Sequence, residues 1–283
     1  MFQTVPSVRP SPLSGQWYPA DPAVLAAQVD QLLAAGAARL PALSGELVGL
    51  LAPHAGIRYS GPVAGTAFAA VRGRTYRYVA VLGPMHYVYR PPVLTTAHAA
   101  YATPLGTVPV AQEVLAAVDR ALRDHLGFGL TPVARDPEHS LEMELIFLQR
   151  ALAAEFQLVP LMFRTVDPRV LERVGQTLAQ VLDPQQDLVV ASSDLSHYFP
   201  QAVAQRLDRE MLRRILALNP LEVLLAEEEG VAQACGRAAI AAMLWAARTW
   251  GATRAHLLHY ATSGDVTGDY DAVVGYAAVA ILR

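Results

Sequence analysis

Residues Asp187–His197 read DLVVASSDLSH, an apolar run that passes directly into a polar loop carrying a histidine. The run has the length and β-branched content of a buried strand. Two further apolar runs end in the same way, Glu46–Leu51 shortly before His54 and Tyr76–Leu82 shortly before His86. Strands that are apolar along their whole length are typical of a parallel sheet covered on both faces.

Helical patterns lie between these strands. Asp21-Pro22 and Asp167-Pro168 each place an N-cap residue before a proline at the first helical position. Further helices are expected at Ser60–Val71, Ala111–Arg123, Ser140–Glu155, Ala202–Leu218, Pro220–Ala226 and Ala234–Trp250, and further strands at Gln157–Met162, Arg254–Ala261 and Ala272–Leu282. The alternation predicts an α/β fold with a largely parallel central sheet flanked by helices, formed as one domain over residues 1–283.

The composition excludes several kinds of chemistry. The chain has 283 residues, and all 22 of its basic residues are arginine, so Schiff-base chemistry and a P-loop lysine are excluded. Its single cysteine, Cys235, excludes internal disulfides and sites built from cysteine alone, and favours a reducing compartment. The net charge of -3 gives no electrostatic reason to expect nucleic-acid binding.

The apolar content of 53% raises the question of a membrane segment. The longest uncharged run, Pro91–Gln112, contains four prolines and is therefore not expected to form a spanning helix. The stretch Met1–Val8 has neither the basic start nor the apolar centre of a signal peptide. We expect a cytoplasmic protein without membrane or nucleic-acid partners.

Ligand-type side chains follow three of the predicted strands: His54, His86, and Asp194 with His197. Ligands of open parallel sheets bind at the carboxyl ends of the strands, where such loops meet. Each histidine could instead cap its own strand, but three such loops at one sheet edge favour a site. Two imidazoles with one anionic ligand are a common arrangement for redox or Lewis-acid metal chemistry. Candidates for the anion are Asp194, Glu138, Glu142 and Cys235.

Glu138-His139-Ser140 begins a predicted helix, with Ser140 as its N-cap. His139 either lies at an ordinary solvated helix start or faces the cleft as a proton donor. His98 and His125 are expected at the surface.

A serine-hydrolase interpretation is also open, with Ser192 or Ser193 beside Asp194 and His197. The G-x-S-x-G pattern of such enzymes is missing, and adjacent Asp and His in one loop seldom form a triad.

Several short motifs occur together in the order known from one family. They are Ser14-Gly15-Gln16-Trp17-Tyr18-Pro19, Pro53-His54-Ala55-Gly56, Tyr59-Ser60-Gly61-Pro62, Gly83-Pro84-Met85-His86, Thr103-Pro104-Leu105-Gly106, Glu138-His139-Ser140-Leu141-Glu142, Ser192-Ser193-Asp194-Leu195-Ser196-His197-Tyr198, Cys235-Gly236-Arg237 and Tyr260-Ala261-Thr262-Ser263. On this set the chain resembles the Memo family, called AmmeMemoRadiSam system protein B in prokaryotes. That family is similar in fold to LigB-type class III extradiol dioxygenases.

The resemblance implies one site for an iron or copper ion. It places His54 and His86 as metal ligands and Cys235 where the dioxygenases have a carboxylate. His139, Asp194 and His197 would then line the same cleft as catalytic or proton-transfer groups.

The resemblance also implies two kinds of function. One is a metal-dependent redox enzyme that acts on a small molecule, associated with radical SAM and AMMECR-like proteins. The other is a non-catalytic module that binds metal or a peptide, with Trp17 and Tyr59 in the cleft. Glu144-Leu145-Ile146-Phe147 departs from the family pattern, and we expect that change to affect packing alone.

Overall fold

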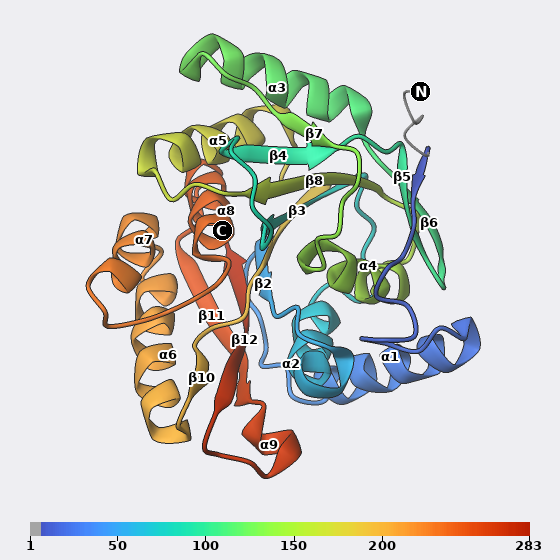
Figure 1. The fold of residues 1–283 in the computed structure, drawn as a ribbon, viewed down its shortest axis with the longest axis vertical. Coiled ribbons are helices and arrows are strands. Elements are labelled where there is room, and N and C mark those ends of the chain that lie inside the picture. Colours follow the sequence, from blue (N-terminus) through green and yellow to red (C-terminus); the bar gives the residue numbers. More distant parts are fainter. Residues whose placement is uncertain (1–6) are drawn as a thin grey trace.

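The computed structural model describes residues 7–283, and a nine-stranded mixed sheet forms the centre of that part of the chain (Figure 1). Most of the stretch Met1–Val8 assessed for a signal peptide lies outside the described residues. The strands of the sheet are β2 (Leu47–Ala52), β3 (Tyr78–Pro84), β4 (Val93–Thr96), β7 (Thr131–Val133), β8 (Gln157–Phe163), β9 (Asp187–Ser192), β10 (His197–Phe199), β11 (Arg254–Thr262) and β12 (Val273–Leu282).

The strands follow the order β10-β12-β2-β9-β3-β8-β4-β7, and β11 pairs with β12. The four central strands β2, β9, β3 and β8 are mutually parallel, whereas β12 joins β2, and β4 joins β8, in antiparallel fashion. A separate three-stranded sheet contains β1 (Val8–Arg9), β5 (Ala100–Thr103) and β6 (Gly106–Pro109). The prediction of an α/β fold with a largely parallel central sheet is confirmed.

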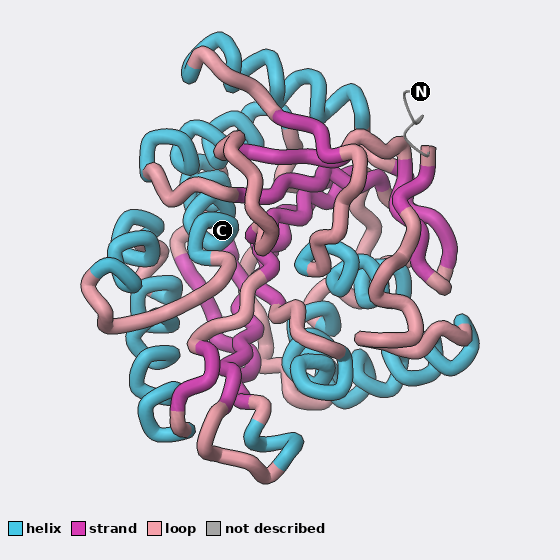
Figure 2. The backbone as a smooth tube through the Cα atoms, in the orientation of Figure 1, coloured by secondary structure: helices cyan, strands magenta, loops and turns pink. Residues whose placement is uncertain are grey.

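Helices cover both faces of the main sheet (Figure 2). They are α1 (Pro22–Ala37), α2 (Ile57–Ala69), α3 (Gln112–Leu126), α4 (Ser140–Ala151), α5 (Pro168–Val181), α6 (Gln201–Leu216), α7 (Pro220–Glu228), α8 (Arg237–Thr249) and α9 (Gly264–Thr267). α2 and α4 pack on one face, with α1 outside α2, and α8 packs on the other, with α5 outside α8. Because both faces are covered, β2 and β9 are buried along their whole length, as continuous apolar strands require.

The local signals for helix starts are partly confirmed. Asp21 and Asp167 accept hydrogen bonds from backbone N–H groups of the first turns of α1 and α5, and a proline follows each of them. α2 begins at Ile57 rather than Ser60 and carries Pro62 within it. The earlier start is stabilised by the N–H of Ile57, which donates to the carbonyl of Trp17.

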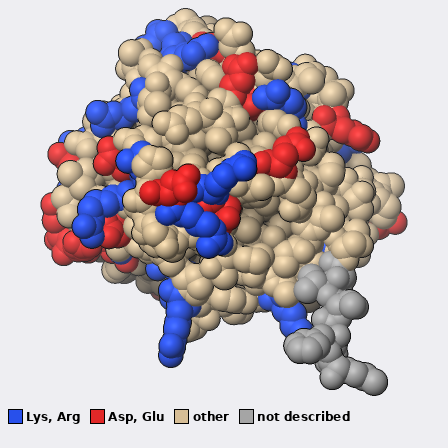
Figure 3. Space-filling view, turned by 90° about the horizontal axis from the view of Figure 1, so that it is seen from above, with Lys and Arg blue, Asp and Glu red and all other residues tan. Residues whose placement is uncertain are grey.

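The uncharged run Pro91–Gln112 forms β4, β5 and β6, three short strands that the sequence analysis did not predict. Within residues 7–283, no helix combines the length and the apolar character needed to cross a bilayer. On the face seen in Figure 3, arginine and acidic side chains are interspersed rather than separated by sign.

A buried ionic network ties the N-terminal strand to the start of α4. Arg9 is fully buried, and its guanidinium lies 2.9 Å from Asp136 and 2.6 Å from Glu142. The same guanidinium donates to the carbonyl of Glu138 at 2.5 Å. Glu142 accepts further hydrogen bonds from the hydroxyls of Ser11 and Tyr18. The network therefore fixes the loop that carries His139.

Replacement of Arg9 by methionine should destabilise the fold strongly. Asp136 and Glu142 would remain buried without a cation, and loss of one partner of a buried ion pair costs about 3–5 kcal/mol. Denaturant unfolding of Arg9→Met measures that loss as a lower free energy of unfolding.

Arg150→Met is the matched control, since Arg150 pairs with Asp30 at the surface. Exposed pairs contribute about 0–1 kcal/mol. If Arg9→Met cost no more than Arg150→Met, the buried network would not stabilise this loop.

Candidate metal centre

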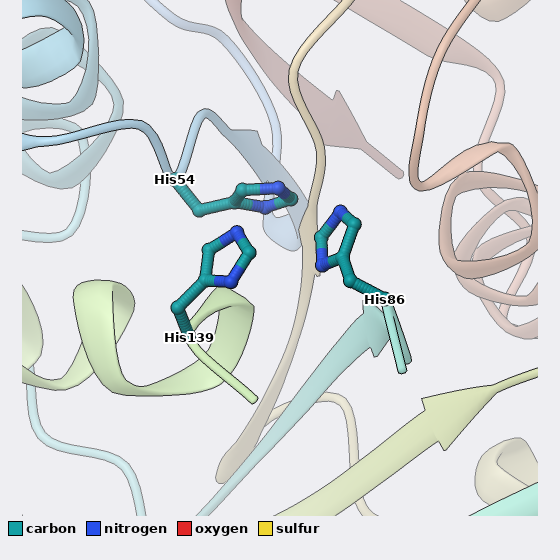
Figure 4. A group of neighbouring side chains, drawn as sticks. All are labelled: His54, His86 and His139. Atoms are coloured by element: carbon teal, nitrogen blue, oxygen red, sulfur yellow. The ribbon is translucent and has the colours of Figure 1, made fainter. Parts of the chain in front are cut away.

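Three histidine-bearing segments meet at one edge of the main sheet. His54 follows β2 and His86 follows β3, and β9, which ends just before Asp194, lies between those two strands. Because the three strands are parallel neighbours, their carboxyl ends bring these loops together. A third ring, that of His139 at the start of α4, points toward the other two (Figure 4). The predicted convergence of the strand-end loops is therefore present.

His54, His86 and His139 offer ligand nitrogens that all lie within 4.8 Å of one another. The rings of His86 and His139 stack with their centroids 4.3 Å apart, and the ring of His54 stands nearly perpendicular to both. The group runs from a buried His54 through a half-buried His139 to an exposed His86. One side of the group is therefore open to solvent, as an accessible metal site requires.

Glu138 holds two of these histidines. One carboxylate oxygen lies 2.8 Å from Nδ1 of His86 and accepts the backbone N–H groups of His139 and Ser140, and the other accepts the N–H of His86. Burial by itself raises the pKa of Glu138, but the hydrogen bond from His86 and the charges of His139 and His86 outweigh burial and lower it to about 2. Glu138 was one of the candidate ligands expected from the sequence, whereas its carboxylate contacts Nδ1 of His86, behind the Nε2 side of the ring. Carboxylates in that position orient metal-binding histidines.

Ser140 does not cap α4, contrary to the prediction. It is the first residue of the helix, and its hydroxyl donates to the carbonyl of Pro84 at 3.0 Å. Gly83 makes this contact possible, because a Cβ at that position would lie 2.6 Å from the Ser140 hydroxyl oxygen. The start of α4 thus packs directly on the end of β3 and brings His139 beside His86.

Burial sets the protonation of two of the rings. Desolvation, with the nearby His139 and His86, lowers the pKa of His54 well below its usual range. Desolvation also lowers the pKa of His139 to about 4, although the charge of Glu138 opposes the shift. Both rings are therefore neutral at pH 7, and neutral imidazole is the form that binds metal ions.

Cys235 lies next to this group. Its Sγ is 3.3 Å from Nε2 of His54 and also 3.3 Å from the backbone nitrogen of Asp194. Burial and the charge of Asp194 raise the pKa of the Cys235 thiol. Gly236 lets the segment lie against β9, since a Cβ there would be 2.4 Å from the carbonyl oxygen of Ser192. The role of Cys235 as a ligand stays a prediction.

The cleft above the histidines has a volume of about 850 Å³. Besides the three histidines it is lined by four other predicted site residues, Trp17, Tyr59, Asp194 and His197. Trp17 flanks His139, with ring centroids 4.6 Å apart. Burial raises the pKa of Asp194 to about 7, against the backbone N–H groups of His54 and Ala55, which lower it. The structure thus gathers the predicted cleft residues, while their individual roles stay predictions.

The structure contradicts the serine-hydrolase interpretation and the expected surface position of His98. Ser192 and Ser193 are both fully buried, and their hydroxyls contact other groups, so neither is an exposed nucleophile of a hydrolase. His98 is 2% exposed and therefore is not a surface residue, whereas His125 is exposed on α3 as expected.

A buried carboxylate on α6, that of Asp208, anchors the loop between Asp194 and His197. It accepts the backbone N–H of Ser196 at 2.9 Å and the hydroxyl of Tyr260 at 2.7 Å. Desolvation raises the pKa of Asp208 above its ordinary value of 3.8, although the hydrogen bonds from Ser196 and Tyr260 oppose the shift.

Asp208→Asn should therefore gain stability relative to the wild type as pH rises from 4 to 7. A raised carboxyl pKa means that the folded state keeps a proton which the unfolded chain has already released, so wild-type stability falls as pH rises from 3.8 through the folded pKa. Asparagine lacks this titration. Urea unfolding at several pH values measures the free energy of unfolding of Asp208→Asn relative to the wild type. Asp124→Asn, at an exposed position, is the control. An advantage of Asp208→Asn that shrinks as pH rises would contradict the assignment.

Comparison with known proteins identifies relatives over nearly the whole chain. Residues 9–280 match the family described as Memo-like protein. A MEMO1 family protein of Methanopyrus kandleri is 36% identical over 282 residues, covering 96% of this chain and 98% of the relative. Relatives with the same family name from Methanocaldococcus jannaschii and Methanosarcina barkeri are 34% and 33% identical and cover 97% of this chain and 99% and 100% of their own lengths. The chain belongs to the Memo-like protein family.

Proposed function

We propose that the protein is a redox protein that binds one iron or copper ion through His54, His86 and His139, with Cys235 as a further ligand. The observation that carries this proposal is the group of three histidines whose ligand nitrogens lie within 4.8 Å of one another at the base of an open cleft. Imidazole and thiolate ligands suit both metals.

The surrounding groups fit a metal ion. Nδ1 of His86 contacts Glu138, and Nδ1 of His54 contacts Ser192, which leaves the Nε2 atoms of both rings for a ligand. Two atoms that bind one ion are separated by no more than the sum of their bonds to it, about 4.4 Å for nitrogen and sulfur. The 3.3 Å between His54 Nε2 and Cys235 Sγ is within that limit. The thiol would lose its proton when it binds.

An iron or copper ion at this position would supply one-electron redox chemistry. The protein's own contribution is to hold His54 and His139 neutral, to orient His86 through Glu138 and to present the cleft to a substrate. His197 and Asp194 line that cleft and are the candidates for moving a proton to or from the substrate. Action together with radical SAM and AMMECR-like proteins is part of the same proposal.

Substitution of the three histidines tests the metal site. Protein purified without oxygen should carry one iron or copper ion per chain, and His54→Ala, His86→Ala and His139→Ala should each weaken binding by at least about tenfold, because each removes one ligand. Mass-spectrometric metal analysis and competition titration measure these losses. His125→Ala, on the exposed face of α3, is the matched control and should bind as the wild type does.

In the same assay, Cys235→Ser distinguishes a site of three histidines alone from a site of three histidines and Cys235. A similar loss of metal indicates that sulfur is a ligand, whereas full retention restricts the set to the three histidines. Retention of metal by all three histidine variants would overturn the proposed site.

A binding function without catalysis is the second candidate, and the rim of the cleft favours it. Tyr59 and Tyr198 are 39% and 75% exposed there, and Tyr198 has a left-handed backbone with φ of 62°. Such strain is characteristic of functional positions. Oxygen uptake by the iron-loaded protein with catechols would support the redox candidate, whereas the absence of uptake would favour a binding module or a different redox reaction.

A further inference from the structure

Glu144 on α4 is a buried acidic residue that the proposed function does not use. Its side chain is fully buried, and one carboxyl oxygen, Oε1, lies 2.5 Å from the hydroxyl oxygen of Ser192. The other oxygen, Oε2, has no hydrogen-bond partner among the described residues. No ion pair to Glu144 occurs in residues 7–283. A buried carboxylate without a cation or a full set of hydrogen bonds is strongly unfavourable.

Ser192 links Glu144 to the metal centre. Its Oγ makes three short contacts, at 2.5 Å to Oε1 of Glu144, 2.7 Å to the carbonyl oxygen of Ser140 and 2.8 Å to Nδ1 of His54. Each of these distances requires a hydrogen between the two atoms. A serine hydroxyl supplies one hydrogen and accepts up to two.

The positions of the three hydrogens follow from the partners. The carbonyl of Ser140 has no hydrogen to give, so the hydroxyl hydrogen of Ser192 must point to it. The hydrogens of the other two contacts must then come from Nδ1 of His54 and from the carboxyl group of Glu144. With Glu144 ionised, one of the three contacts would join two oxygens, or an oxygen and a nitrogen, with no hydrogen between them.

We propose that Glu144 is kept as a neutral carboxylic acid that donates to Ser192 and thereby holds the hydrogen of His54 on Nδ1, leaving the Nε2 lone pair for the ion. The significance of Nε2 rests on the proposed function, whereas the hydrogen positions rest on the contacts alone. Glu144 is thus a positioning residue that acts on the metal centre through Ser192.

Two further observations agree with this assignment. Burial raises the pKa of Glu144 well above its usual range, the Ser192 hydrogen bond opposes the shift, and the charge of Asp194 adds to it. Nε2 of His54 lies against Sγ of Cys235. The ring of His54 is edge-on to the rings of His86 and His139, so its Nε2 is on the side where the ion would bind. The expectation that the change at Glu144–Phe147 affects packing alone is therefore replaced by a hydrogen-bonding role at Glu144.

Spectroscopy of the metal-free protein tests the hydrogen positions directly. Isotope-edited infrared spectra should show the carbonyl band of a protonated carboxylic acid that disappears in Glu144→Gln. Nitrogen-15 NMR of histidine-labelled protein, with His54 assigned by the signal lost in His54→Ala, should show His54 protonated at Nδ1. An ionised Glu144, or a hydrogen on Nε2 of His54, would overturn the proposal.

Two variants separate the hydrogen bond from the shape of the side chain. In Glu144→Gln the amide donates to Ser192, so the Nδ1-protonated form and the affinity for Co²⁺, read from its visible absorption, should be retained. Glu144→Met keeps a similar volume but has no donor, and it should lose the preference for Nδ1 and bind Co²⁺ about 10–100-fold more weakly. If Glu144→Met keeps both properties, Glu144 has no positioning role.

The outcomes also distinguish this inference from the proposed function. A wild-type protein that binds no metal would refute the metal site, yet the infrared and NMR measurements on the metal-free protein would still decide the state of Glu144. If Glu144→Met does not fold, the wild-type spectra and the Glu144→Gln variant still decide it.

Discussion

The carboxylate of Glu138 is the contact on which the site depends, because it joins two segments that the sheet alone would not align. It accepts the backbone N–H and lies against Nδ1 of His86, and it accepts the N–H groups at the start of α4. The guanidinium of Arg9 donates a hydrogen bond to the backbone carbonyl of Glu138, and the carboxylate of Asp136 accepts the backbone N–H of Glu138. The buried ionic network is therefore also the support of the histidine group.

The parallel order of β2, β9 and β3 provides the other half of the arrangement. Neighbouring parallel strands deliver their following loops to the same edge, so His54 and His86 meet without any contact specific to them. The partners of the two rings then differ in kind: a charged carboxylate contacts His86, which is exposed, whereas a hydroxyl contacts His54, which is buried. A charged partner suits the ring that water reaches, and a neutral one suits the ring that it does not.

Sequence reasoning predicted the features that local patterns encode. The apolar runs and their histidine loops locate β2, β3 and β9, and the Asp-Pro pairs locate the starts of α1 and α5.

The features it missed depend on contacts between distant segments. Nothing in the spacing of Glu138-His139-Ser140 shows that α4 will pack on Gly83, so the spacing alone predicted neither the contact of Glu138 with His86 nor the stacking of His139 on His86. The family resemblance had placed His139 in the same cleft. Residue type made Cys235 one of four candidate anionic ligands, and only the family resemblance singled it out as the partner of His54 and His86. The short strands β4 to β6 were not predicted, because their segment is rich in proline and shows little alternation of apolar and polar residues.

The Arg9 network also bears on the order in which the molecule is assembled. Arg9 pairs with residues 127 and 133 positions away, and the contact between His54 and Cys235 spans 181 positions. Such distant contacts form only when most of the chain has collapsed into its native arrangement. An unfolded or partly synthesised chain therefore lacks the complete set of proposed ligands, so an ion that binds at this site would have to enter through the open cleft after folding. An ion bound at the proposed site only in the native state would in turn raise the free energy of unfolding of the whole sheet, and it would link metal supply to the lifetime of the folded protein.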